Sequence, residues 1–232
     1  MASEKPAVLV AGGTGALGAA VLEALLEKGY PVTTTWVVDE ERERIESDFA
    51  GRSGLMLVKA DLMDPEAVDE AVGDVENLGA IVNLVGGFSM PGKVHESDIE
   101  DFEKQLRLNL RPGFLLARAG IPRLISNGGG AFVGVSARPA LQPFAGAAGY
   151  ITAKAGVLAF IRALDAEYRQ DGVRCNAILP SVIDTPANRR AQPDADYSKW
   201  VSPQQIAKVV CFLVSDDSAV TSGGAIPVYG RA

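Results

Sequence analysis

The stretch Ala7-Val-Leu-Val-Ala-Gly-Gly-Thr-Gly-Ala-Leu-Gly18 decides the fold. Its apolar start predicts a buried strand, Ala7–Ala11, and a helical pattern, Ala16–Lys28, follows the glycines directly. Glycines permit a tight turn, let the backbone approach a pyrophosphate and let a helix pack closely on a strand. A glycine-rich turn can also serve structure alone, but its place at the first strand–helix junction favours dinucleotide binding at the helix N-terminus.

The same alternation of apolar runs and helix-period segments continues to the end of the chain. It predicts an α/β fold with a doubly wound parallel sheet (Rossmann-type), as a single domain over residues 1–232. The polar stretch Pro186–Trp200 is the best candidate for a mobile loop. The other expected strands are Val32–Trp36, Leu55–Lys59, Ala80–Val85, Gly130–Val135, Val173–Leu179 and Ala225–Val228, and the other expected helices are Pro65–Gly73, Asp98–Asn109, Pro112–Ser126, Ala153–Gln170 and Pro203–Val214.

Charge and composition exclude several classes of protein. The formal net charge of −7 argues against nucleic acid as a partner, which would need a basic face. No apolar stretch reaches the length that spans a bilayer, so no membrane partner is expected, and Met1–Pro6 lacks the apolar core of a signal peptide. We therefore expect a cytoplasmic protein that acts on a small-molecule substrate.

Cysteine and histidine are too rare for several kinds of site. Cys175 and Cys211 each lie in apolar stretches, so we expect two buried, reduced thiols. His95 is the only histidine of the chain. A metal site and a Ser-His-Asp triad are therefore not expected.

Polar and small residues follow the expected strands at their carboxyl ends, where this fold binds its ligands. Asn83-Leu-Val-Gly-Gly87 ends the fourth strand. Asp61 follows the third strand, where its carboxylate could accept a hydrogen bond from an adenine amino group or could cap the helix that begins near Pro65. The acidic run Asp39–Glu41 after the second strand is expected to form the first turn of a helix.

Tyr150 and Lys154 carry the expected chemistry. Four residues apart at the start of a helix, their side chains fall on one face. A phenol is a poor acid at neutral pH, and a nearby ammonium should lower its pKa toward the working range. Ser136 closes the fifth strand, where its hydroxyl could donate to a substrate carbonyl, and Asn109 lies within the preceding helix.

These motifs, in this order, resemble the short-chain dehydrogenase/reductase family over essentially the whole chain. They are the glycine loop, Asn83-Leu-Val-Gly86, Asn109, Ser136, Tyr150-Ile-Thr-Ala-Lys154 and Asn176-Ala-Ile-Leu-Pro180. The resemblance implies that Tyr150 is the general acid/base, that Lys154 tunes it and holds the nicotinamide ribose, that Ser136 orients the substrate oxygen and that Asn109 supports a water-linked proton relay.

The resemblance also implies an NAD(P) cofactor and a homodimer or homotetramer, formed through the long helices expected over Asp98–Ser126 and Ala153–Gln170. The residues expected to contact the cofactor are Gly12, Gly13, Thr14, Gly15, Ala16, Leu17, Gly18, Trp36, Asp61, Leu62, Asn83, Val85, Gly86, Tyr150, Lys154, Pro180, Ile183 and Thr185.

A narrower resemblance, to dihydropteridine reductases, rests on Val85-Gly-Gly-Phe88 and on Leu179-Pro-Ser-Val-Ile-Asp-Thr-Pro-Ala-Asn-Arg189. The chain departs from family patterns at three places. Ala16 takes the position of the middle loop glycine, Ala137 stands at the usual spacing of the catalytic serine, and Trp36 ends the second strand where pterin reductases have an acid.

The sequence thus predicts a reductase that transfers a hydride to a carbonyl or quinonoid ring. Phe88, Met90, Tyr197 and Trp200 could line the apolar pocket that holds such a substrate. A non-catalytic NAD(P)-binding sensor or scaffold and an epimerase of the same superfamily are the alternatives. Because no acid ends the second strand, the cofactor preference leans slightly to NADPH, and Arg42 and Arg44 could reach its 2′-phosphate, whereas the run Asp39–Glu41 opposes this.

Overall fold

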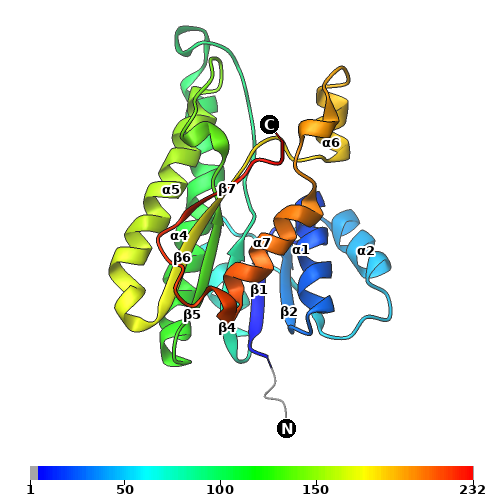
Figure 1. Cartoon of the computed structure of the whole chain (residues 1–232), viewed down its shortest axis with the longest axis vertical. Helices are drawn as coiled ribbons and strands as arrows, with labels where there is room; N and C mark the ends of the chain where they lie inside the picture. The colour runs from blue at the N-terminus through cyan, green and yellow to red at the C-terminus, as the bar shows by residue number, and fades with distance from the viewer. Residues whose placement is uncertain (1–4, 232) are drawn as a thin grey trace.

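The computed structural model describes residues 5–231, and within them seven parallel strands form one sheet in the order β3-β2-β1-β4-β5-β6-β7 (Figure 1). This confirms the predicted fold class. Residues 1–4 and 232 lie outside the described residues, and with them most of the segment judged not to be a signal peptide. The strands are β1 (Ala7–Ala11), β2 (Val32–Trp36), β3 (Leu55–Lys59), β4 (Leu78–Asn83), β5 (Gly130–Val135), β6 (Val173–Pro180) and β7 (Ala225–Val228).

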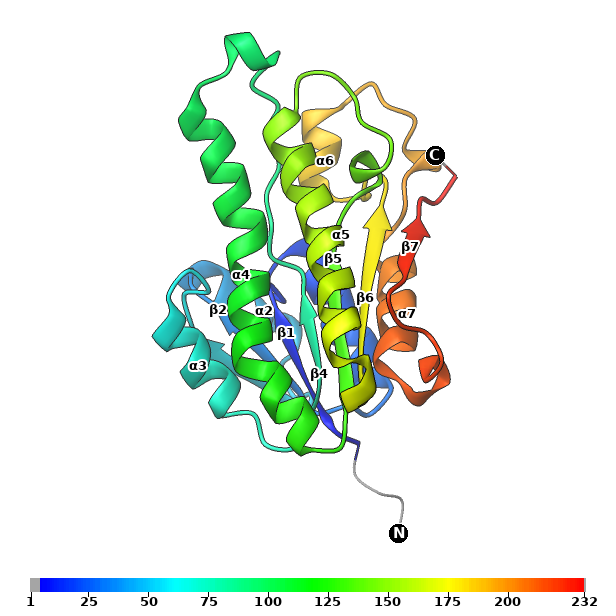
Figure 2. The same cartoon turned by 90° about the vertical axis from the view of Figure 1, so that its left-hand side faces the viewer.

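Helices cover both faces of the sheet, as Figures 1 and 2 show. Alternate residues of β1 enter opposite cores: Leu9 packs with α3, α4 and α5, and Val8 and Val10 pack with α1, α2 and α7. The helices are α1 (Ala16–Glu27), α2 (Asp39–Asp48), α3 (Pro65–Gly73), α4 (Ile99–Ser126), α5 (Ala148–Tyr168), α6 (Pro186–Ala191) and α7 (Pro203–Val214), and the single 3-10 turns are η1 (Val94–Glu96), η2 (Arg138–Ala140), η3 (Arg169–Asp171), η4 (Tyr197–Lys199) and η5 (Asp216–Ser218).

Several element boundaries differ from those expected. Strand β4 begins at Leu78, because Leu78 pairs with Ala7, and it ends at Asn83 instead of Val85. The two helices expected on either side of Arg111 are one helix, α4, with Pro112 buried inside it. A proline removes one backbone hydrogen bond, but the apolar stripe of α4 continues past it and packs on the sheet, so the helix continues.

Two further predictions are corrected near the carboxyl ends of the strands. Helix α5 begins at Ala148 instead of Ala153, which places Tyr150 within its first turn. The stretch expected to be a mobile loop, Pro186–Trp200, contains α6 and η4 and is fastened at its start by an ion pair between Arg189 and Asp184. Thr185 supplies the N-cap of α6 by accepting a hydrogen bond from the Asn188 N–H.

Other expectations hold. The acidic run Asp39–Glu41 forms the first turn of α2, and both Cys175 and Cys211 are buried and unpaired. No helix within residues 5–231 combines the length and the apolar character needed to cross a membrane.

The parallel arrangement brings the carboxyl ends of all strands to one edge of the sheet, at the top of Figure 1. Ala11, Trp36, Asn83, Val135 and Pro180 are the last residues of their strands there. The candidate site residues follow these ends, so the topology collects them along one edge.

The last strand is held in register by a buried amide. Asn176 of β6 is completely buried, its Nδ2 donates to the carbonyl of Thr221 at 2.8 Å, and its Oδ1 accepts from the N–H of Gly224 at 3.0 Å. Both partners belong to the segment that leads into β7.

We expect Asn176→Ala to lower the free energy of unfolding by about 2–3 kcal/mol, because two backbone groups lose their partner and a small void forms. Urea unfolding measures this change. Gln204→Ala, at an exposed position of α7, is the control and should change little. Equal stability of the two variants would contradict the role given to Asn176.

Candidate active site

The glycine loop between β1 and α1 has no room for side chains at three positions. Gly12 has a φ of +80°, a left-handed conformation that favours glycine. A Cβ atom at Gly13 would overlap the side chain of Thr34, and one at Gly18 would overlap the carbonyl oxygens of Gly12 and Gly13. The loop therefore keeps the tight, backbone-only surface that a pyrophosphate requires.

The N-terminus of α1 is open to an anion. Its N-cap is Gly15, no side chain caps its free N–H groups, and its first turn holds no acidic residue. Side chains cap α3, α6 and α7, whereas α2, α4 and α5 also lack a side-chain cap, so the feature that distinguishes α1 is the glycine loop before its open N-terminus. An uncapped helix N-terminus behind a glycine loop fits the pyrophosphate of a dinucleotide.

The expected adenosine end of the site lies beside Trp36. The guanidinium of Arg42 lies 5.2 Å from the centroid of the Trp36 ring, and the ammonium of Lys59 lies 5.0 Å from it. Both are cation–π contacts. Lys59 reaches Trp36 because the two residues are paired in the register of β2 and β3. The strand end that lacks an acid is thus flanked by two cations.

The structure separates two roles that the sequence left open for Asp61. Asp64, not Asp61, caps α3, by accepting a hydrogen bond from the Glu66 N–H at 3.0 Å. Asp61 accepts instead from the Met63 N–H at 2.9 Å, and it remains exposed at the carboxyl end of β3. The side chain of Leu62 is buried in the core, so only its backbone can contact a cofactor.

The end of β4 joins the glycine loop to the catalytic candidates. The Val85 N–H donates to Asn83 Oδ1 at 3.1 Å, and a Cβ atom at Gly12 would lie 3.2 Å from the Val85 nitrogen. At Gly86, a Cβ atom would lie 2.8 Å from Lys154 Nζ. A glycine at this position therefore lets Lys154 approach the backbone at the end of β4.

Asn109 and Lys154 lie beside that glycine and are almost fully buried. Asn109 Oδ1 accepts from the Gly87 N–H at 3.2 Å, and its Nδ2 donates to the carbonyls of Gly87 and Gln105. Lys154 Nζ donates to the carbonyl of Val135 at 2.9 Å. Helices α4 and α5 and the ends of β4 and β5 thus meet at one point.

Tyr150 is partly buried beside this cluster. Its ring centroid lies 6.0 Å from Lys154 Nζ, and the ring of Phe88 meets it edge-on at 4.9 Å between centroids and 83° between planes. Burial raises the pKa of Tyr150 to about 12 and lowers the pKa of Lys154 to about 8. The expected lowering of the phenol pKa by the ammonium is therefore not seen here, because burial of the phenol raises its pKa.

Ser136 departs from its expected place. It is 1 % exposed, and its hydroxyl donates to the carbonyl of Lys154 at 2.7 Å. The proton is thus directed at α5 and not into the cleft, so the geometry does not support contact with a substrate oxygen. Ala137, at the family's usual serine spacing, offers no hydroxyl.

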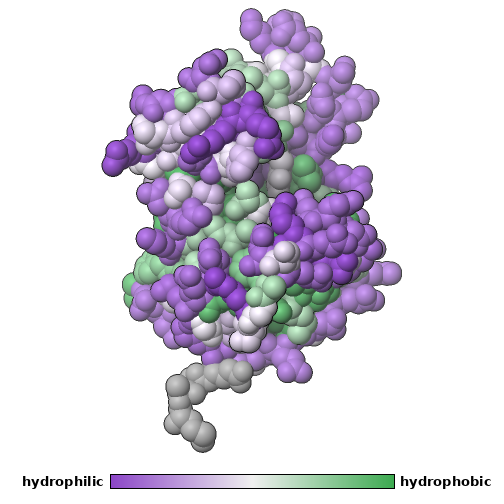
Figure 3. Space-filling model, turned by 90° about the vertical axis from the view of Figure 1, so that its right-hand side faces the viewer, coloured by the Kyte–Doolittle hydropathy of each residue, from purple (hydrophilic) through white to green (hydrophobic). Residues whose placement is uncertain are grey.

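The segment after β6 begins at the same edge of the sheet. Pro180 ends β6 in the core, and Ile183 pairs with Val201 as an isolated parallel bridge. The hydroxyl of Thr185 is used as the N-cap of α6. Figure 3 views the face that carries α2 and α6, where polar side chains cover both elements and less polar atoms lie in the band between them.

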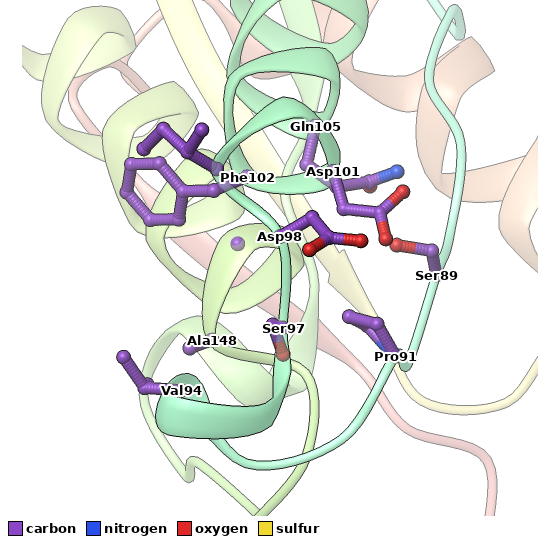
Figure 4. Close-up of a pocket in the computed structure, with 11 residues that line it drawn as sticks. Ser89, Pro91, Val94, Ser97, Asp98, Asp101, Phe102, Gln105 and Ala148 are labelled. Atoms are coloured by element: carbon purple, nitrogen blue, oxygen red, sulfur yellow. The ribbon is translucent and has the colours of Figure 1, made fainter.

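The apolar pocket expected from Phe88, Met90, Tyr197 and Trp200 stays a prediction, and none of the four lines the cavity described below. Phe88 and Met90 are more than half exposed, and Tyr197 and Trp200 pack on each other at 4.8 Å between ring centroids. A cavity of about 310 Å³ lies instead between the start of α4, the loop after β4 and the start of α5 (Figure 4). Gln105, which holds Asn109, lines it; Tyr150 and Lys154 do not.

Sequence reasoning missed two contacts of α2 with the glycine loop. Thr14 Oγ1 donates to Glu41 Oε2 at 2.6 Å, and Arg44 donates to the carbonyl of Thr14. The spacing of Glu41 and Arg44, three residues on one helix face, is the signal in the sequence. It does not say which residue the face meets.

Comparison with known proteins places this geometry in a family. The family described as short chain dehydrogenase matches residues 6–196. The chain is similar to 2-(R)-hydroxypropyl-CoM dehydrogenase of Xanthobacter autotrophicus, with 30% identity over 96% of each chain, and to acetoacetyl-CoA reductase of Shinella zoogloeoides, with 29% identity over 96% of each.

Solved structures agree with the fold. A short-chain type dehydrogenase/reductase from Mycobacterium ulcerans superposes with a TM-score of 0.93 at 22% identity, covering 100% of this chain and 90% of its own. ElxO with NADP bound superposes with a TM-score of 0.91 at 22% identity, covering 97% and 98%. The match of the family to most of the chain confirms the enzyme class predicted from the sequence. The chain belongs to the short-chain dehydrogenase family and is an NAD(P)-dependent oxidoreductase.

Proposed function

We propose that the protein reduces a carbonyl or a quinonoid ring of a small molecule, with Tyr150 as the general acid/base. The observation that carries the proposal is the cluster of Lys154 and Asn109 at Gly86, with the Tyr150 ring centroid 6.0 Å from Lys154 Nζ, next to a glycine loop with an uncapped helix N-terminus. A sensor or scaffold would need only the loop and the helix N-terminus.

The bound dinucleotide supplies the hydride, delivered from its nicotinamide ring. The residues proposed to hold it are those of the glycine loop from Gly12 to Gly18, with Trp36, Asp61 and the backbone of Leu62 at the adenosine end. Asn83, Val85 and Gly86 are proposed for its middle, and Pro180, Ile183 and Thr185 for its nicotinamide end.

Tyr150 suits the role of proton donor in the direction of reduction. With its pKa raised to about 12 by burial, the phenol keeps its proton throughout the neutral range. Lys154, with a pKa of about 8, keeps its charge at neutral pH and can stabilise the phenolate that proton donation leaves. Asn109 holds the turn at Gly87, and Ser136 anchors α5 at Lys154, as positioning residues.

The cofactor preference is proposed to lean to NADPH. Support comes from the two cations beside Trp36, Arg42 and Lys59, where an acid selective for NAD would otherwise stand. The substrate class is supported by the names of similar proteins, which act on secondary alcohols or ketones. A quinonoid dihydropterin remains a candidate through the narrower sequence resemblance.

A homodimer or homotetramer and a cytoplasmic location stay predictions from the sequence. The exposed ring of Phe114 on α4, packed against Phe160 of α5, supports an interface on these two helices. Size-exclusion chromatography at micromolar concentration tests the assembly, and a monomer alone would contradict it.

Tyr150→Phe keeps the ring and removes the proton donor. We expect kcat for NAD(P)H-dependent reduction to fall roughly 10²–10⁴-fold, with nearly unchanged dissociation constants for the cofactors. Activity is followed by cofactor oxidation with a panel of ring ketones, quinones and a quinonoid dihydropterin. Tyr168→Phe, at the far end of α5, is the matched control. If Tyr150→Phe keeps most of kcat when chemistry is rate-limiting, Tyr150 is not the acid.

Lys154→Met tests the buried ammonium through stability. The folded-state pKa of Lys154, about 8, lies below its ordinary value of about 10.4 in an unfolded chain. Between these two values the unfolded chain binds more protons, so the wild-type free energy of unfolding should rise with pH, by about 3 kcal/mol at most.

Lys154→Met should lack this contribution. Urea unfolding of both chains at about pH 7.5 and about pH 9.5 measures the difference, since the ionisation of other groups, tyrosines included, is common to both chains. We expect the free energy of unfolding of the wild type to rise relative to that of the variant as pH rises. An identical pH dependence in the two chains would show that the ammonium is not desolvated.

A further inference from the structure

Two side chains of helix α2 form hydrogen bonds with the glycine loop. Glu41 Oε2 accepts the hydrogen bond of the Thr14 hydroxyl at 2.6 Å, and Arg44 donates to the carbonyl of the same residue. Thr14 is 6 % exposed, so these bonds lie in a sheltered place. One turn of α2 therefore fixes the centre of the loop from outside.

The other acids in the first turn of α2 are directed elsewhere. The side chain of Asp39 is 65 % exposed, and its carboxylate lies 3.8 Å from Arg42 Nε. Glu40 is exposed. Among Asp39, Glu40 and Glu41, the hydrogen bond to the loop belongs to Glu41.

In a dinucleotide fold of this kind, the adenosine ribose lies between the glycine loop and the end of the second strand. Glu41 spans the same two elements, because it stands on the helix that follows β2 and contacts the loop at Thr14. Its Oε1 is not used in the bond to Thr14, so one oxygen is left to accept from a ribose hydroxyl.

We infer that Glu41 limits the preference for NADPH: its carboxylate favours a dinucleotide with a free 2′-hydroxyl and disfavours one with a 2′-phosphate. The inference rests on the proposed cofactor site. It also explains why two cations beside Trp36 give only a slight lean to NADPH, since a fixed negative charge opposes them at the same ribose.

Acidic neighbours partly compensate one of the cations near Trp36, so the charge of Glu41 matters to the balance. The guanidinium of Arg42 is shared among Asp39 and Glu43, each at 3.8 Å, and Glu46, at 3.2 Å. Its positive charge is thus partly compensated by its own helix. Lys59, across the Trp36 ring from β3, and Arg44, which donates to the carbonyl of Thr14, are the opposing positive charges.

Glu41→Gln isolates the charge. The glutamine oxygen can still accept the Thr14 hydroxyl, so the hydrogen bond to the loop is kept while the negative charge is removed. Dissociation constants for NADH and NADPH are measured by calorimetry for the wild type, Glu41→Gln and the control Glu40→Gln, which removes the same charge one residue away. Thermal unfolding of each variant checks the fold.

We expect Glu41→Gln to shift the NADH-to-NADPH affinity ratio at least about tenfold toward NADPH at low salt, and Glu40→Gln to shift it less than about threefold. High salt should reduce both shifts. An equal shift in the two variants, an unchanged ratio, or equal weakening of both cofactors by Glu41→Gln would each overturn the inference. Should the glutamine variant unfold, Glu41→Ala removes the charge together with the bond to Thr14, and a shift of the affinity ratio toward NADPH is again expected.

The measurement separates this inference from the proposed function. If the wild type binds neither dinucleotide, both fail. If it binds them and Tyr150→Phe loses turnover while Glu41→Gln leaves the NADH-to-NADPH affinity ratio unchanged, the proposed reductase function is supported and only the role given to Glu41 is wrong.

Discussion

The buried ammonium of Lys154 is the constraint on which the site depends. Within residues 5–231 no carboxylate pairs with it, and burial alone lowers its pKa to about 8. Three neighbours accommodate the desolvated ammonium. The carbonyl of Val135 accepts its hydrogen bond, and Gly86 has no side chain that would collide with it. The hydroxyl of Ser136 donates to the backbone carbonyl of Lys154. Each of these residues stands at a strand end, so the parallel sheet is what makes the arrangement possible.

Much of the fold and of the site follows from local patterns. The glycine loop, the alternation of elements and the spacing of Tyr150 and Lys154 depend on neighbours in the chain, and the structure places them as expected. Two of the errors depend on partners distant in the sequence. Strand β4 starts early because it pairs with β1, and α4 passes Pro112 because its apolar stripe packs on the sheet.

Polar side chains were the least predictable part of the site. The sequence places Ser136 at the end of β5 but cannot show that its proton goes to the backbone of Lys154. Likewise, Asp39 is the first acid after β2, but the phase of α2 turns it toward Arg42 and turns Glu41 toward Thr14. The step of two residues from Asp39 to Glu41 decides which carboxylate reaches the loop, and the phase of α2 is set by Ile45 packing into the core.

The most direct test of the account is the titration of the Tyr150 phenol in the protein without cofactor. Tyrosine labelled with ¹³C at Cζ reports ionisation by NMR, and comparison with Tyr150→Phe assigns the resonance. Burial beside Phe88 predicts that this phenol stays protonated until about pH 12, two units above an ordinary tyrosine of about 10. A titration at or below the ordinary value would contradict the account, because it would mean that the charge of Lys154 outweighs desolvation.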